Sequence, residues 1–203
     1  TMNSIPYTIG LVQINNSFSG VNYLPYSVGL LQAYAEKYLT DPLKFNYLAP
    51  VYTRIPVQSA ADHLSGVDIA GFSLYVWNER LSLEIMRRLK VACPEVLIIC
   101  GGPQVPDRCE QFLRDNPFID VVVHGEGEQA FLNFLENYPS KDWSSISGVS
   151  WITSDGKFVT KPKSERIKDL STIPSPYLEG IFDSLMEENP EREWLILWET
   201  NRG

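Results

Sequence analysis

Residues 96–128 read VLIICGGPQVPDRCEQFLRDNPFIDVVVHGEGE. Two apolar runs, Val96–Cys100 and Val121–Val123, flank a helical pattern over 107–115 that follows Pro106. A run without polar alternation is typical of a central strand in a parallel sheet, which is buried on both faces. The segment therefore predicts a strand–helix–strand unit with a glycine-containing turn after each strand.

The same alternation extends over the first 140 residues. Five short apolar runs, bounded by turn residues, occur at Tyr7–Ile14, Phe45–Ala49, Asp68–Ser73, Val96–Cys100 and Asp120–His124. Helical periodicities lie between and after them, at 27–39, 57–64, 79–92, 107–115 and 128–138. This alternation predicts an α/β fold, a flavodoxin-like or Rossmann-like doubly wound sheet of five parallel strands in the order 2-1-3-4-5.

The pattern changes after Tyr138. We expect a β-hairpin, a polar linker, a short helix and a last strand at 149–160, 169–177, 180–188 and 193–198, respectively. The chain is therefore predicted to contain an α/β domain (1–140), a hairpin and linker (141–190) and the start of a further domain (191–203).

Composition narrows the class of protein. The formal net charge of −8, with no basic cluster, argues against nucleic acid as a partner, because phosphate binding needs a local excess of Lys and Arg. We see no membrane span, because the apolar runs fall short of the roughly 20 residues one requires. Cys93, Cys100 and Cys109 match no zinc or iron–sulfur spacing, so we interpret them as reduced packing residues. Together these features predict a cytoplasmic protein.

Four loops are expected to meet at the carboxyl edge of the predicted sheet. They are residues 15–29, 73–78, 101–104 and 125–128, and they combine small residues, aromatics and a few amides or hydroxyls. Glycine pairs let a backbone approach a ligand closely, and aromatics offer flat apolar faces. Any one loop could be only a tight turn or a packing site. Together they suit a large, flat, mostly uncharged ligand with peripheral amides.

Six motifs follow one another along the chain. They are Leu24-Pro25-x-x-x-Gly29-Leu30, Gly71-Phe72-Ser73, Gly101-Gly102-Pro103, Asp120-Val121-Val122-Val123-x-Gly125-Glu126-Gly127-Glu128, Leu170-Ser171-x-Ile173-Pro174-Ser175-Pro176-Tyr177 and Glu199-Thr200-Asn201-Arg202-Gly203. Together they resemble the cobalamin (B12)-binding domain of the cobalamin-dependent radical S-adenosylmethionine (SAM) enzymes. That family includes methyltransferases and proteins like the anaerobic magnesium-protoporphyrin IX monomethyl ester cyclase.

The resemblance implies that this chain is an N-terminal cobalamin-binding module, with residues 191–203 as the start of a truncated radical SAM barrel. In such enzymes Cys-x-x-x-Cys-x-x-Cys usually follows next and holds a [4Fe–4S] cluster. Cobalamin is the implied cofactor and the C-terminal barrel of the same polypeptide the implied partner, with SAM and the cluster bound there. We expect no catalytic residue in this chain itself, and methyl transfer or cyclase-like radical chemistry in the parent protein.

The resemblance also implies which residues contact cobalamin. They are Leu24, Pro25, Tyr26 and Gly29 in the first loop, Ser73, Leu74, Tyr75, Trp77 and Asn78 in the second, Gly101, Gly102, Pro103 and Gln104 in the third, and Gly125, Glu126 and Gly127 in the fourth. Among these, Ser73 and the Gly101-Gly102 pair match the small residues that line the channel for the nucleotide tail.

The loop after the first strand departs from a wider pattern. Many cobalamin domains carry Asp-x-His-x-x-Gly there, and that histidine ligates cobalt. Here the loop holds Asn15, Asn16 and Ser17. His124 is the only conceivable alternative ligand, so we expect cobalamin to be held base-off without a protein imidazole.

Other interpretations remain. The fold could be vestigial and serve as an interaction or capping module, with Tyr26, Tyr75 and Trp77 plugging the site. A receiver-like domain is disfavoured because the first and third strands do not end in carboxylates. A dinucleotide-binding site is disfavoured because the sequence has no Gly-x-Gly-x-x-Gly after the first strand. FMN binding stays open as an alternative.

Overall fold

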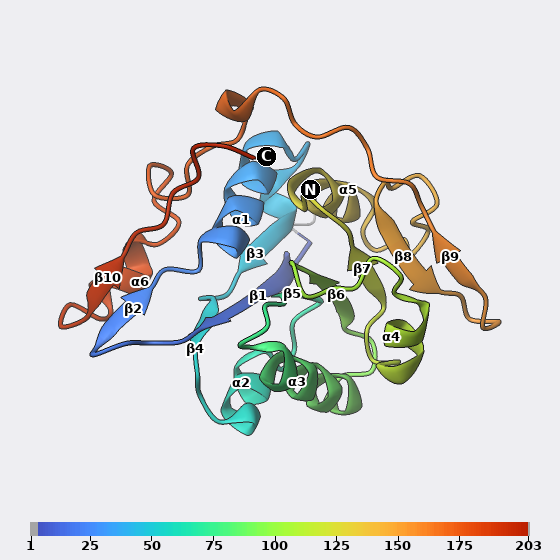
Figure 1. Ribbon diagram of the computed structural model, residues 1–203, viewed down its shortest axis with the longest axis horizontal. Helices are drawn as coiled ribbons and strands as arrows, with labels where there is room; N and C mark the ends of the chain where they lie inside the picture. The colour runs from blue at the N-terminus through green and yellow to red at the C-terminus, as the bar shows by residue number, and fades with distance from the viewer. Residues whose placement is uncertain (1–3, 203) are drawn as a thin grey trace.

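The fold is built on one eight-stranded sheet with helices on both faces (Figure 1). The structure is a computed structural model that describes residues 4–202. The parallel strands run in the order β3-β1-β5-β6-β7, with bounds β1 Tyr7–Asn15, β3 Phe45–Tyr47, β5 Ile69–Ser73, β6 Leu97–Gly101 and β7 Val121–Val123. A further strand, β4 (Val51–Thr53), also pairs with β1. The predicted α/β class with a mainly parallel sheet is confirmed.

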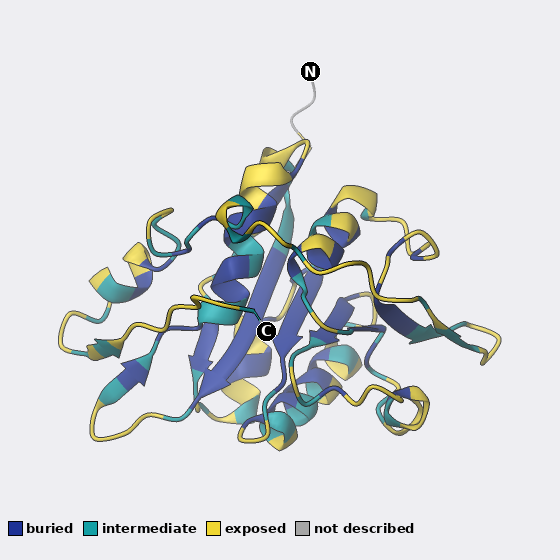
Figure 2. Ribbon diagram, turned by 45° about the horizontal axis from the view of Figure 1, so that its top comes forward, coloured by how far each residue is buried: buried dark blue, intermediate teal, exposed yellow. Residues whose placement is uncertain are grey.

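The helices divide between the two faces of this sheet. Helices α1 (Tyr26–Tyr38) and α5 (Glu128–Asn137) cover one face, where they share a core with Leu11 and Ile99. The other face carries α2 (Val57–His63), α3 (Glu79–Ala92) and α4 (Glu110–Asp115). Alternate strand residues point to opposite faces, which explains the two separate cores. Figure 2 shows the central strands buried and the outer helix surfaces exposed.

Helix α4 is shorter than the predicted segment 107–115. The structure places its N-cap at Cys109, whose backbone is not helical, so the helix begins at Glu110. None of the helices in the described part of the chain combines the length and the apolar character that crossing a bilayer requires.

The predicted hairpin extends the same sheet. Strand β8 (Val149–Ile152) pairs antiparallel with β7, and β9 (Phe158–Thr160) pairs antiparallel with β8. The turn between them contains Gly156, whose φ of 86° lies in the left-handed region that favours glycine. The hairpin therefore covers the edge that β7 would otherwise leave open.

The last part of the chain returns to the loop after β1. Strand β10 (Glu193–Leu195), shorter than the predicted 193–198, pairs in parallel with β2 (Val21–Tyr23). The short helix α6 (Asp183–Glu187) lies nearby, and Phe182 and Leu185 form a small core with Leu24. Two single 3₁₀ turns, at Pro42–Lys44 and Leu170–Thr172, complete the elements.

Candidate functional site

A cavity of about 1250 Å³ lies at the carboxyl edge of the sheet, on the face covered by α1 and α5. Its floor includes Gly71 and Ser73 of β5 and Ile99 and Gly101 of β6. In the register of these strands Gly71 lies opposite Ile99 and Ser73 opposite Gly101. Three of these four residues are glycine or serine, so few side-chain atoms project from this part of the sheet. The space above it therefore stays open.

The turn after β6 packs tightly against the turn after β5. Gly102 has φ of 100°, and a Cβ at this position would lie 2.5 Å from the carbonyl oxygen of Leu74. The backbone N–H of Leu74 donates to the carbonyl of Gly101 (2.8 Å), and that of Gln104 donates to the carbonyl of Leu74 (3.1 Å). Glycine is required here because both the φ angle and the close approach exclude a side chain.

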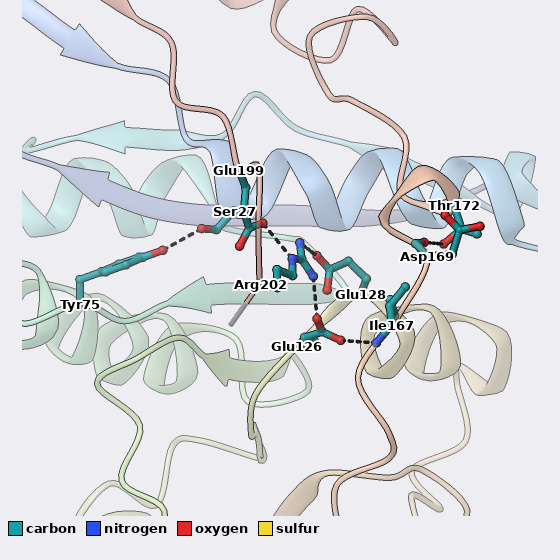
Figure 3. Close-up of polar contacts among 9 residues, drawn as sticks. All are labelled: Ser27, Tyr75, Glu126, Glu128, Ile167, Asp169, Thr172, Glu199 and Arg202. Atoms are coloured by element: carbon teal, nitrogen blue, oxygen red, sulfur yellow. Dashed lines mark hydrogen bonds and ion pairs between the residues drawn. The ribbon is translucent and has the colours of Figure 1, made fainter.

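An aromatic pair, Tyr75 and Trp77, lines the cavity next to these turns. The two rings stack with centroids 4.6 Å apart and planes 15° from parallel. The Tyr75 hydroxyl lies 2.7 Å from Ser27 Oγ, as Figure 3 shows, and the Trp77 indole donates to the carbonyl of Ile14 (3.1 Å). The pair thus has a defined orientation and offers a flat surface to the cavity.

Asn78 holds the loop that carries the aromatic pair. Its Nδ2 donates to the carbonyls of Ile14 (3.0 Å) and Ser73 (3.1 Å), and its Oδ1 accepts from the backbone N–H of Tyr75 (2.9 Å). The residue is only 1% exposed. It therefore connects the ends of β1 and β5 from below the cavity wall.

The structure brings ten of the sixteen implied contact residues to the cavity wall: Tyr26, Ser73, Tyr75, Trp77, Gly101, Gly102, Pro103, Gly125, Glu126 and Gly127. The other six lie outside the lining: Leu24, Pro25, Gly29, Leu74, Asn78 and Gln104. Leu24 and Leu74 are fully buried. Gly29 packs against the ring of Phe182, where a Cβ would come within 2.3 Å. Contact between any of the sixteen residues and a cofactor stays a prediction.

Two amides of β1, Gln13 and Asn15, also line the cavity, although neither belongs to the implied contact set; Asn15 belongs to the first predicted loop. Gln13 and Asn15 alternate along β1, so both point to the cavity side of the sheet. Gln13 Oε1 accepts from the backbone N–H of Val28 (3.2 Å). Asn15 is 8% exposed, and its Nδ2 has no hydrogen-bond partner within residues 4–202. Buried amides at the end of an otherwise apolar strand were the available signal.

A cluster of charged residues joins the chain's last residues to the Gly-Glu-Gly-Glu turn (Figure 3). Arg202 donates to Glu128 (2.6 Å), Glu199 (2.8 Å) and Glu126 (3.3 Å). The second carboxylate oxygen of Glu126 accepts from the backbone N–H of Ile167 (2.9 Å). Burial lowers the pKa of Arg202, but the bonds and charges of its carboxylate partners outweigh burial and raise it. We call Glu126, Glu128, Glu199 and Arg202 the Arg202 cluster.

His124 lines the cavity at the end of β7. Its Nε2 lies 2.9 Å from Ser150 Oγ and 3.6 Å from Cys109 Sγ. Burial, and then the charge of Lys163, lower its pKa from the ordinary value. Across residues 4–202, no group of three or more His, Cys, Asp or Glu side chains could hold a metal ion. The three cysteines are unpaired thiols, as predicted.

Sequence comparisons identify relatives of known class. A family model described as "B12 binding domain" matches residues 47–135. The chain is 38% identical over 193 residues to the cobalamin-dependent radical SAM methyltransferase TokK of Streptomyces tokunonensis, covering 92% of this chain and 28% of TokK. It is 36% identical over 203 residues to the 2-(S-pantetheinyl)-carbapenam-3-carboxylate methyltransferase of Streptantibioticus cattleyicolor. This match covers 97% of this chain and 28% of that enzyme. The chain thus spans little more than a quarter of these relatives.

Solved structures share the fold. The cobalamin-dependent SAM radical enzyme OxsB with aqua-cobalamin bound superposes with a TM-score of 0.67 at 20% identity, over 95% of this chain and 26% of OxsB. The radical SAM methyltransferase TsrM of Kitasatospora setae, with cobalamin and a [4Fe–4S] cluster bound, superposes with a TM-score of 0.54 at 16% identity. This superposition covers 84% of this chain and 31% of TsrM. At these identities the likeness concerns the fold, and it agrees with the resemblance carried by the sequence motifs.

Proposed function

Since this chain carries a B12-binding domain homologous to those of cobalamin-dependent radical SAM enzymes, we propose that it binds cobalamin for a longer protein of that kind. The observation that carries the proposal is the cavity between the sheet and α1 and α5, with its floor of small residues. Bound cobalamin would supply a cobalt centre able to carry a methyl group. This chain's part is to hold and orient it.

The cavity fits a ligand of this size and chemistry. Its volume of about 1250 Å³ exceeds the roughly 300–1,000 Å³ of ordinary small-molecule pockets. Its wall combines apolar surface with the amides of Gln13 and Asn15. The buried Nδ2 of Asn15 has no hydrogen-bond partner within residues 4–202, which costs stability. A cofactor with peripheral amides and a polar tail matches this wall.

We assign two roles to the lining residues. Ser73, Gly101 and Gly102 leave room for the nucleotide tail to enter beside the sheet. The aromatic pair, Tyr75 and Trp77, presents a flat face at the end of β5, which suits the corrin ring. The end of β1 and the loop after it carry Asn15, Asn16 and Ser17 in place of a histidine, which supports a base-off cofactor without a protein imidazole on cobalt.

The vestigial alternative requires a filled site. Here Tyr75 and Trp77 stack on each other, and Tyr26 stacks on Tyr177 with ring centroids 5.6 Å apart. These aromatics form part of the wall of a cavity that stays large. The geometry thus favours a binding module over a module that has lost its cofactor.

Filling the cavity floor should weaken cobalamin binding without unfolding the protein. In Gly101→Val, the new Cβ would lie 3.7 Å from Val123 Cβ, an ordinary contact, and the rest of the side chain would enter the cavity. We expect the Kd for hydroxocobalamin, measured by absorbance titration and gel filtration, to rise at least about tenfold. Asn46→Val adds the same β-branched side chain to an exposed position of β3 and serves as the control.

Two results would contradict the proposal. Hydroxocobalamin that fails to bind the wild-type chain would favour the vestigial module. Equal affinity in the wild type and Gly101→Val would place the ligand outside this cavity.

We further propose that the longer protein transfers methyl groups or performs related radical chemistry, with SAM and a [4Fe–4S] cluster in a C-terminal barrel. The two curated methyltransferases to which the chain is 36–38% identical support this proposal. A version extended to the length of those relatives should bind both an iron–sulfur cluster and cobalamin, and it should cleave SAM under reducing conditions. Cluster binding without SAM cleavage would argue against radical chemistry.

A further inference from the structure

His124 sits between the cavity and the β8–β9 hairpin. Its backbone N–H donates to the carbonyl of Gly148 (2.8 Å) just before β8. Its ring reaches Ser150, which is fully buried, and Cys109, also fully buried. The ring is thus anchored on the side away from the cavity, which the residue also lines.

The hydrogen bonds determine where the ring carries its proton. The hydroxyl of Ser150 donates to Thr160 Oγ1 (2.8 Å), which uses its single proton. This leaves Ser150 Oγ to accept from His124 Nε2, which lies 2.9 Å away. The hydrogen-bond pattern thus assigns the proton to Nε2 and the lone pair of the neutral ring to Nδ1.

The surroundings keep the ring neutral. Burial is the main cause that lowers the pKa of His124; Lys163 lowers it further and Asp107 opposes this. Lys163 Nζ and Asp107 lie 3.6 Å apart as an exposed ion pair. Cys109 is another titratable neighbour of the ring, and burial raises the pKa of its thiol and keeps it protonated. At neutral pH Nδ1 is thus a hydrogen-bond acceptor.

We propose that His124 is a specificity-determining residue of the cavity, whose Nδ1 accepts a hydrogen bond from an amide N–H or hydroxyl of the bound cofactor. This inference rests on the proposed function. His124 follows β7, two strands from β5 and its aromatic pair, which corresponds to roughly 10 Å. It therefore lies beside the periphery or tail of the ligand and away from the metal.

Two substitutions separate the acceptor from the anchor. His124→Asn places an amide oxygen close to the position of Nδ1 and cannot titrate. His124→Gln keeps a donor within reach of Ser150 but loses the acceptor. We expect the Kd of His124→Asn for hydroxocobalamin to stay within about threefold of the wild-type value at neutral pH. The Kd of His124→Gln should rise about tenfold. All of these binding measurements use the full chain of residues 1–203.

The pH profile provides the readout that a merely structural role would not move. Since the pKa of His124 is lowered, the ring becomes protonated only as pH falls below the ordinary histidine value of about 6.5 and through that lowered pKa, and protonation of Nδ1 then removes the acceptor. Wild-type affinity should fall across this acid window, whereas His124→Asn should show no such dependence. In the free protein, imidazole ¹⁵N chemical shifts should show the Nε2–H tautomer.

Each failure has a distinct signature. A Gln variant that binds like the wild type, or a free protein with the proton on Nδ1, overturns the inference alone. A cobalt absorbance spectrum that differs between the wild type and His124→Gln would make His124 a cobalt ligand and overturn it as well. No binding of hydroxocobalamin by the wild type at any pH overturns the proposed function and this inference with it.

Discussion

Gly102 and Gly156 both adopt positive φ, but their surroundings differ. At Gly102, with φ of 100°, a Cβ would lie 2.5 Å from the carbonyl oxygen and 2.6 Å from the nitrogen of Leu74. At Gly156, with φ of 86°, no heavy atom of the described residues beyond Gly156 and its two chain neighbours lies within 4 Å of the corresponding position. Substitution at Gly156 thus costs backbone strain alone, and substitution at Gly102 adds a clash between two backbones that shape the cavity.

Alanine at each position should separate these two costs. We expect Gly156→Ala to lower the free energy of unfolding by about 1 kcal/mol. Gly102→Ala should lower it by about 2–4 kcal/mol, because the contact with Leu74 cannot relax without moving the β5 turn. Urea denaturation followed by circular dichroism measures both. Equal losses would show that the turn adjusts to a side chain.

Among the elements, the start of α5 connects segments far apart in sequence. Glu126 and Glu128 in the Gly-Glu-Gly-Glu turn bind Arg202, and Glu126 also accepts from the backbone of Ile167. The side chains of Arg202 and Glu128 are only 13% and 5% exposed. Removing one partner of such a pair leaves a buried charge uncompensated. The Arg202 cluster therefore holds the chain's last segment across the cavity.

Loss of Arg202 should release that segment locally. We expect Arg202→Gln to cost about 3 kcal/mol, which corresponds to roughly a hundredfold increase in the opening of residues 196–202. Hydrogen exchange followed by mass spectrometry measures this opening. Arg114→Gln is the control, because Arg114 and Glu110 are 41% and 54% exposed and their pair contributes little. Unchanged exchange in Arg202→Gln would show that the β2–β10 pairing alone holds the segment.

For the whole molecule, ligand binding and folding are coupled because the cavity lies between two layers. The floor belongs to β5 and β6, and the opposite wall includes Leu31 of α1 and Phe131 of α5. Unfolding separates these layers and destroys the site. A ligand held between them therefore stabilises the folded chain by mass action.

This coupling predicts a thermal shift. Hydroxocobalamin at a hundred times its Kd should stabilise the fold by about 2.7 kcal/mol. For a chain of this size that corresponds to a rise in Tm of roughly 5–10 °C. Cobinamide, which lacks the nucleotide tail, should give a smaller shift at the same concentration. Equal shifts from the two compounds would show that the tail does not occupy the space over Gly101.

Local patterns were sufficient for much of the fold. The apolar run Val121–Val123 and the helical period of Glu79–Ala92 depend on neighbouring residues, and the structure contains both elements where they were predicted. The glycine turns at 101–102 and 125–127 follow from backbone geometry, and they do line the cavity. The family resemblance, read from the order of these turns, agrees with the comparisons.

The remaining features depend on partners distant in the chain. Strand β2 is three residues long, too short for a periodic pattern, and it was not predicted; it forms by pairing with β10, whose segment was predicted as a strand without a partner. The tautomer of His124 depends on Ser150 and, through it, on Thr160, and the Arg202 cluster brings together residues 126 and 202. Periodicity records which side of an element faces a core, but these contacts arise only when separate elements pack. The sequence therefore determined the layers and the edge of the sheet where the cavity lies, and the tertiary structure decided which polar side chains meet there.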